Sequence, residues 1–289
     1  MATGIKASDS FTVSKLHPVL GAQIIGVDLS QNLDDKTIDQ IKQAWYDHSV
    51  LLFRDQEISE DDQLRFAGYF GTVAERVIPP PGADTPLGPE WTNMLMVTDK
   101  VDENGEALGA LGHGEMCFHA DKSYVKSPHQ ASFLYGIEVP SEGGHTKFSS
   151  LHAAYNNMPD EWKTRFENAL VMHGYNYNGK KVDLDTNLDS IMHFRQPLVL
   201  ANHHSGRKGL FLSRLFTMWI EGLESDESKA ILDRLFELTE DAKIIYEHVW
   251  QPGDLVMWDN ICCLHARTDW PEDQRRMLRR CTVEGAPLW

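Results

Sequence analysis

The chain has 289 residues, of which 42% are hydrophobic and 24% are charged, and its formal net charge at pH 7 is −16. This composition is ordinary for a soluble enzyme that buries a sizeable core. The acidic balance argues against a nucleic-acid surface, which needs clustered Lys and Arg. A membrane span is also not expected, because no apolar run approaches the roughly 18 residues that a spanning helix requires.

The four cysteines have neither the spacing of a zinc site nor the density of a disulfide scaffold. Residues 1–10 lack the apolar core of a signal peptide. We therefore expect a cytoplasmic enzyme without a nucleic-acid or membrane partner. Large β domains commonly exceed about 200 residues as one unit, so we expect a single domain over residues 1–289.

The amino-terminal part of the chain is predicted to alternate strands and helices. Residues 22–29 predict an opening strand. A helix is expected to begin at residue 34 or 35, both aspartates suited to an N-cap, and to end near residue 48. Residues 49–53 form a short apolar run typical of a buried strand. A second helix, acidic in its first turn, is expected over residues 59–71.

Two segments have the composition of long loops. Residues 76–113 contain several prolines and glycines around one predicted strand at 91–97, and residues 175–192 are polar and irregular. Long loops in a compact domain are usually lids or binding loops. We predict that both segments are lids, and a plain connecting loop is the alternative.

The rest of the chain is predicted to consist of short strands and a few helices. This pattern is typical of a mainly β protein in which two sheets form a jelly roll, the double-stranded β-helix, flanked by helices. The expected strands are 130–138, 145–149, 197–203, 209–213, 243–250, 254–258, 262–267 and 276–284, and the expected helices are 150–157, 159–170 and 225–240.

The strongest chemical signal is a histidine two residues before an aspartate. In an extended strand His119 and Asp121 leave the same face, so both side chains point into whatever cavity that face lines. His265, in a predicted strand near the carboxyl end, is the best candidate for a third ligand. Two imidazoles and one carboxylate with open positions beside them are the donor set of non-haem iron(II) oxygenases. A surface histidine near an acid is the alternative.

Two arginines follow His265 on the last predicted strand. If residues 276–281 are extended, Arg276 and Arg280 share one face, and a cavity there buries two guanidiniums together. A buried unpaired charge is costly, so this arrangement requires anions. Bidentate recognition of carboxylates is the interaction for which arginine is best suited. Pairing with an acid of the protein itself is the alternative for each arginine.

The order and spacing of these residues resemble one known family, over about residues 16–284. The chain looks like the taurine dioxygenase and dichlorophenoxyacetate dioxygenase family of iron(II)- and 2-oxoglutarate-dependent oxygenases. The matching elements are His119-x-Asp121, Gly143-Gly-x-Thr146, the motif Gln-Pro-Gly-Asp-Leu-Val-Met-Trp-Asp-Asn at 251–260, His265, Arg276 and Arg280.

The resemblance implies a double-stranded β-helix and a site for iron, 2-oxoglutarate and dioxygen. His119, Asp121 and His265 would hold Fe(II). Arg276 and Thr146 would hold the distal carboxylate of 2-oxoglutarate, whereas an ordinary strand threonine is the alternative for Thr146.

The resemblance also suggests an anionic small-molecule substrate. Arg280 matches the position that contacts the anionic group of the substrate in the taurine enzyme, and Arg76 stands where that enzyme has a histidine for the sulfonate. We predict hydroxylation of a small anionic molecule with release of succinate and CO₂. Desaturation or epoxidation of a larger natural product is the alternative within this chemistry. A zinc-bound hydrolase and a non-catalytic jelly-roll binding protein are the alternatives from other classes. The sequence leaves open the substrate, the carbon attacked and the oligomeric state, and it is compatible with a homo-oligomer.

Overall fold

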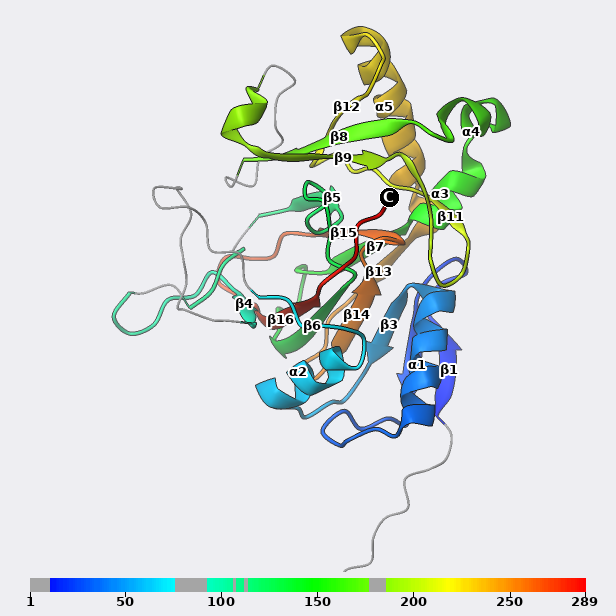
Figure 1. The fold of residues 1–289 in the computed structure, drawn as a ribbon. Helices are drawn as coiled ribbons and strands as arrows, with labels where there is room; N and C mark the ends of the chain where they lie inside the picture. Colours follow the sequence, from blue (N-terminus) through cyan, green and yellow to red (C-terminus); the bar gives the residue numbers. More distant parts are fainter. Residues whose placement is uncertain (1–10, 76–92, 106–107, 112–113, 177–185) are drawn as a thin grey trace, which may run out of the picture.

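The computed structural model describes residues 11–75, 93–105, 108–111, 114–176 and 186–289. The fold is mainly β with helices packed outside the sheets, as the sequence predicts (Figure 1). None of the described helices is long and apolar enough to cross a membrane.

Two sheets make up the centre of the described structure. The large sheet has seven strands within the described residues, in the order β1 (Thr12–Lys15), β2 (Ala22–Ile25), β3 (Val50–Phe53), β14 (Leu255–Asp259), β6 (Ala131–Glu138), β16 (Met277–Val283) and β4 (Leu95–Val97). The small sheet has the order β13 (Ile245–His248), β7 (Thr146–Ser150), β15 (Cys263–Arg267) and β5 (Met116–His119).

The centre of the large sheet is buried on both faces, as strand β3 shows. Val50 and Leu52 belong to the apolar cluster between the two sheets, which also contains Phe148 of β7. Leu51 and Phe53 point the other way, into a cluster that the helices α1 (Asp35–His48) and α2 (Glu60–Gly68) cover. A strand covered on both faces has a continuous apolar sequence rather than an alternating one.

Capping side chains determine where these two helices begin. Asp34 is the N-cap of α1, where its carboxylate accepts a hydrogen bond of 2.7 Å from the Thr37 amide. Ser59 and Asp62 form a capping box at the start of α2. The predicted starts of both helices are therefore confirmed, although α2 ends at Gly68 and not at residue 71.

The remaining elements form a third layer on the other side of the small sheet (Figure 1). Its members share one apolar cluster between helices and short strands. They are the helices α3 (Leu151–Asn157), α4 (Asp160–Phe166) and α5 (Ser225–Thr239), the strands β8 (Leu170–Tyr175), β9 (Met192–Pro197) and β12 (Thr217–Ile220) of one sheet, the β10 (Val199–Ala201) and β11 (Lys208–Leu210) pair, and the 3₁₀ turns η1 (Leu188–Ser190) and η2 (Ala242–Ile244).

The prediction of a helix over 159–170 is wrong in its second half. Helix α4 ends at Phe166, and strand β8 begins at Leu170 and pairs with both β9 and β12. The apolar side chains of this stretch fit a helical repeat and a strand equally well, and pairing with distant strands selects the strand. The strands β8, β9 and β12 were not expected for the same reason.

The two predicted lids lie partly outside the described residues, which omit 76–92, 106–107, 112–113 and 177–185. Of the first segment, β4 pairs with β16 at the edge of the large sheet. Of the second, η1 leads into β9. A lid role for either segment stays a prediction.

Candidate metal centre

Two imidazoles meet across neighbouring strands of the small sheet. His119, the last residue of the edge strand β5, is the direct cross-strand partner of His265 on β15. Their ring centroids are 4.1 Å apart, and both side chains are almost entirely buried. The pairing register of the two strands therefore places two potential nitrogen ligands side by side.

Asp121 completes the group from a turn. Strand β5 ends at His119, and Asp121 begins a turn in which Lys122 has a φ of 55°. The expected convergence of the three side chains is present, but the strand alternation offered as its reason is wrong. The Oδ1 atom of Asp121 lies 3.9 Å from Nε2 of His119 and 3.9 Å from Nε2 of His265. The ligand atoms of the three residues all lie within 4.8 Å of one another.

A chain of hydrogen bonds orients the carboxylate of Asp121. Ser132 Oγ donates to Asp121 Oδ2 at 2.8 Å, and Asn260 Nδ2 donates to Ser132 Oγ at 3.0 Å. Trp258 Nε1 in turn donates to Asn260 Oδ1 at 2.9 Å. Arg280 also donates to Asp121 Oδ2. The two direct donors, Ser132 and Arg280, both engage Oδ2, so Oδ1 is the oxygen that faces the two imidazoles.

The sequence interpretation missed these orienting residues. Trp258 and Asn260 belong to the motif at 251–260 and, two residues apart at the end of β14, could have been found from it. Ser132 is separated from Asp121 by 11 positions, and nothing in its sequence context indicates the contact.

The ionisation states suit a divalent metal. Burial lowers the pKa of His119 and of His265, so both imidazoles are neutral near pH 7. Nδ1 of His119 lies 2.8 Å from the carbonyl oxygen of Cys117, which places the proton on Nδ1 and the lone pair on Nε2. Burial, the largest single influence, would raise the pKa of Asp121, but the Arg280 guanidinium and the neighbouring histidines together outweigh it, and the net shift is downward. Two neutral imidazoles and a carboxylate are deprotonated ligands that a metal can bind without displacing protons.

A cavity of about 50 Å³ adjoins the two imidazoles. Both histidines line it, and so do Thr146, Arg276 and Arg280. The structure thus brings the predicted co-substrate residues to the same space as the predicted metal ligands.

Arg276 is a buried cation that the protein only partly satisfies. It is 2% exposed, its Nε donates to the carbonyl of Gly144 at 3.0 Å, and its guanidinium lies over the ring of Trp270 at 5.2 Å. Its Nη1 has no hydrogen-bond partner among the described residues. Burial lowers its pKa to about 9. A carboxylate in the cavity would meet both the charge and the free donor.

The glycines before Thr146 allow Arg276 to reach this position. Gly143 and Gly144 have φ of +70° and +63°, which side chains rarely adopt. A Cβ atom on Gly144 would lie 3.0 Å from Cδ of Arg276. Thr146 itself is buried, and its hydroxyl accepts a hydrogen bond of 3.0 Å from Trp250 Nε1.

The two predicted substrate contacts have different outcomes. Arg76 lies outside the described residues. Arg280 is paired with Asp121, so the alternative of pairing with an acid of the protein describes its contact in this structure. Arg280 nevertheless lines cavities on both sides of that ion pair.

In a mainly β protein, two imidazoles and a carboxylate arranged in this way match the donor set of non-haem iron oxygenases. Comparison with known proteins identifies the family. The chain belongs to the family described as "Taurine catabolism dioxygenase TauD, TfdA family", which matches residues 12–282. It is accordingly a 2-oxoglutarate-dependent dioxygenase, the activity for which several of its relatives are named.

Three similar proteins illustrate the range of the family. Pentalenolactone F synthase of Streptomyces avermitilis is 32% identical over 283 residues, covering 90% of each chain. The (S)-phenoxypropionate/alpha-ketoglutarate-dioxygenase of Sphingobium herbicidovorans is 30% identical over 291 residues, covering 97% of each chain. The crystal structure of a putative alpha-ketoglutarate dependent 2,4-D dioxygenase from Burkholderia xenovorans is 28% identical with a TM-score of 0.75, covering 97% of this chain and 99% of that one.

Proposed function

We propose that the protein hydroxylates a small anionic organic molecule in a reaction that consumes dioxygen and 2-oxoglutarate at Fe(II). The observation that supports this most directly is the convergence of His119, Asp121 and His265 beside a cavity that contains the partly unsatisfied guanidinium of Arg276. We further propose that the two central sheets form the jelly roll of a single domain.

The donor set supports a specific choice of metal ligands. Nε2 of His119, Nε2 of His265 and Oδ1 of Asp121 would hold Fe(II), because these atoms face one another while Oδ2 is engaged by Ser132 and Arg280. Bound iron, 2-oxoglutarate and dioxygen together supply the oxidising chemistry that inserts oxygen into a substrate C–H bond, with succinate and CO₂ as co-products.

The residues of the neighbouring cavity would position the co-substrate. Arg276 would bind the distal carboxylate of 2-oxoglutarate through Nη1, while the carbonyl of Gly144 and the ring of Trp270 keep the guanidinium in place. The hydroxyl of Thr146 would donate to the same carboxylate, since it accepts from Trp250 and keeps its own proton available. Both residues would exclude water and fix the orientation of 2-oxoglutarate. Binding and orientation are what a protein contributes to cofactor chemistry.

Relatives favour an anionic substrate. Two of them are named for aryloxy acids, (S)-phenoxypropionate and 2,4-dichlorophenoxyacetate, and another for sulfate esters. Similarity to pentalenolactone F synthase keeps a second outcome, desaturation or epoxidation of a larger natural product, as the alternative. Family membership favours an oxygenase over the zinc-bound hydrolase and the non-catalytic binding protein.

The proposal is tested by oxygen-dependent succinate formation. Protein loaded anaerobically with Fe(II) and 2-oxoglutarate would be mixed with oxygen and one candidate at a time from sulfonates, phosphonates, aryloxy acids and amino acids. We expect at least one anion to increase succinate production in step with its own hydroxylation. Protein loaded with Zn(II) is the matched control and should produce none. Substrate conversion by the zinc form without oxygen would contradict the proposal and indicate a hydrolase.

A further inference from the structure

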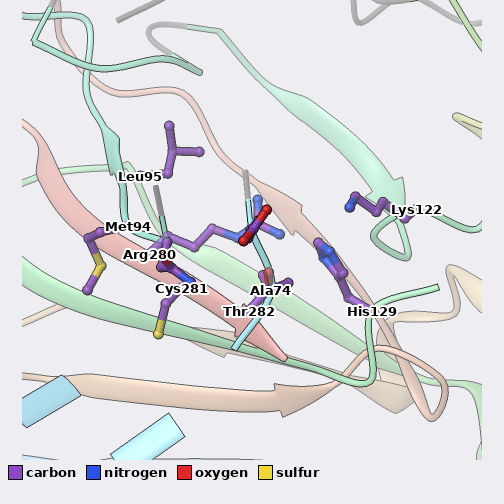
Figure 2. A pocket seen from close by; sticks show the side chains of 10 residues that line it. Ala74, Met94, Leu95, Lys122, His129, Arg280, Cys281 and Thr282 are labelled. Carbon is purple, nitrogen blue, oxygen red and sulfur yellow. The ribbon is translucent and has the colours of Figure 1, made fainter. Parts of the chain in front are cut away.

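A second cavity, of about 140 Å³, lies beside the metal ligands, and it is called here the Lys122 cavity (Figure 2). Figure 2 shows Arg280 entering from one side and Lys122 and His129 from the other, with the three side chains pointing toward one another. Arg280 lines both this cavity and the co-substrate cavity. Two positive charges and an imidazole therefore surround one small space.

Three buried polar atoms beside this space lack partners among the described residues. His129 is 9% exposed, and neither of its ring nitrogens has a hydrogen-bond partner among the described residues. The same holds for the buried Nε of Arg280. A buried polar atom without a partner is costly, and native structures contain few of them. A neutral imidazole offers one donor and one acceptor, and the Arg280 Nε offers a second donor, so these atoms indicate a polar ligand that carries acceptor atoms.

The position of Lys122 adds charge to this site. Lys122 directly follows Asp121 and has a left-handed φ of 55°, which turns its side chain away from the path of strand β5. Non-glycine residues in this region are uncommon and concentrate at functional sites. The carboxylates that act on Lys122 are Asp121, which already accepts from Ser132 and Arg280, and Glu284. Its ammonium is thus available to a ligand.

The walls of the Lys122 cavity define the rest of that ligand. Ala74, Met94 and Leu95 give it apolar surface, and the one acid among the lining residues, Glu75, is exposed. Apolar walls with a few convergent donors are typical of sites for small organic molecules. The geometry points to Lys122 as a specificity-determining residue that, beside Arg280, would hold the anionic group of the primary substrate, a carboxylate, sulfonate or sulfate on an apolar aryl or alkyl body.

This inference rests on the proposed oxygenase function and deepens it. Arg280 lines the Lys122 cavity and is paired with Asp121, one of the proposed metal ligands. The side chain of Arg280 therefore connects the cavity to the metal site. An anion bound there would hold its own apolar body within reach of the metal while 2-oxoglutarate occupies the cavity of Arg276. The two anions would thus be kept apart, each with its own cation.

The test compares a charged probe with a neutral one. Phenoxyacetate and hexyl sulfate are the anions, and 2-phenoxyethanol is the neutral partner of phenoxyacetate. Binding is measured by calorimetry without oxygen, on protein loaded with Fe(II) and saturating 2-oxoglutarate, so that the probes cannot occupy the co-substrate cavity. The variants are Lys122→Met and Lys122→Gln, with Lys122→Arg as the conservative change and the exposed Lys126→Met as the matched control.

We expect Lys122→Met and Lys122→Gln to weaken binding of both anions at least tenfold, to leave 2-phenoxyethanol unchanged, and to leave the KM for 2-oxoglutarate unchanged. Lys122→Arg should retain the preference for anions, and Lys126→Met should behave as the parent protein does. Equal loss for charged and neutral probes, unaltered binding of the anions, or failure of the parent protein to bind either anion would overturn the inference. Charge-selective binding that depends on Lys122 but produces no succinate with oxygen would instead contradict the proposed function while leaving the anion site in place.

Discussion

The two cavities that meet at Arg280 hold their cations in different ways. In the co-substrate cavity, Arg276 is fixed by a carbonyl, by an aromatic ring and by a glycine pair that leaves room for it. In the Lys122 cavity, the described residues give Lys122 no comparable contact, and neither ring nitrogen of His129 has a hydrogen-bond partner among them. A rigid guanidinium suits a co-substrate that never varies, because preorganisation lowers the cost of binding. The long stem and rotatable ammonium of a lysine suit an anionic group whose position differs from one substrate to another.

The largest effect is expected from removal of a metal ligand, because the contents of both cavities would react at the metal. His119→Ala removes one of three ligands, so we expect iron binding and turnover to fall below detection. Metal content after dialysis and succinate formation are the two measurements. The exposed His193→Ala is the matched control and should keep both. Full iron content in the His119 variant would show that the metal lies elsewhere.

Arg276→Met tests the co-substrate cavity alone. A hydrogen-bonded charge pair contributes about 1.5–3 kcal/mol, so we expect the KM for 2-oxoglutarate to rise by about 10- to 100-fold. Affinity for phenoxyacetate, measured at saturating 2-oxoglutarate, should stay the same, which would separate the two cavities. Arg275→Met is the control, because Arg275 is exposed and pairs with Glu138. An unchanged KM in the Arg276 variant would remove the assignment of this cavity to the co-substrate.

Ser132→Ala tests the hydrogen bonds that the two cavities share through Asp121. Loss of an orienting partner of a metal ligand typically costs about 10- to 100-fold in metal affinity or activity. We expect the lower end of this range, because Arg280 still engages Oδ2 of Asp121. Titration with Fe(II) under anaerobic conditions measures the change, and the exposed Ser141→Ala should show none. A loss as complete as that of His119→Ala would mean that Ser132 does more than orient the carboxylate.

The sequence predicts the co-substrate cavity better than the Lys122 cavity, and the reason is physical. His119, Asp121, His265 and Arg276 occur at spacings that a motif can specify. The cross-strand pairing of His119 with His265 depends on the register of two strands far apart in the chain, which no local pattern encodes. Asp121 reaches the site through a turn and not through strand alternation.

The Lys122 cavity has no signal of that kind. His129 appears in the sequence as one of 13 histidines, and only the packing of the loop before β6 against β16 buries it beside Arg280. The error at β8 has the same origin, since pairing with β9 and β12 decided between two conformations that the local sequence allowed equally. Contacts between distant segments are what the sequence alone does not specify here.

The last expected effect is on stability and not on activity, and it concerns His129 and the pH dependence of unfolding. Burial, reinforced by the positive charges of Lys122 and Arg280 and opposed by Asp121, lowers the pKa of His129 to about 3. Between that value and its ordinary pKa near 6.5, the unfolded chain binds a proton that the folded chain does not, so this residue destabilises the fold as the pH falls. Lowering the pH from 7 to 5 should therefore cost the parent protein about 2 kcal/mol through His129, a cost that His129→Phe avoids. Urea unfolding at the two pH values measures the difference, with the exposed His193→Phe as the control. Equal pH dependence in the parent protein and the His129 variant would mean that the imidazole is protonated in the folded state, and the Lys122 cavity would then hold three cations and not two.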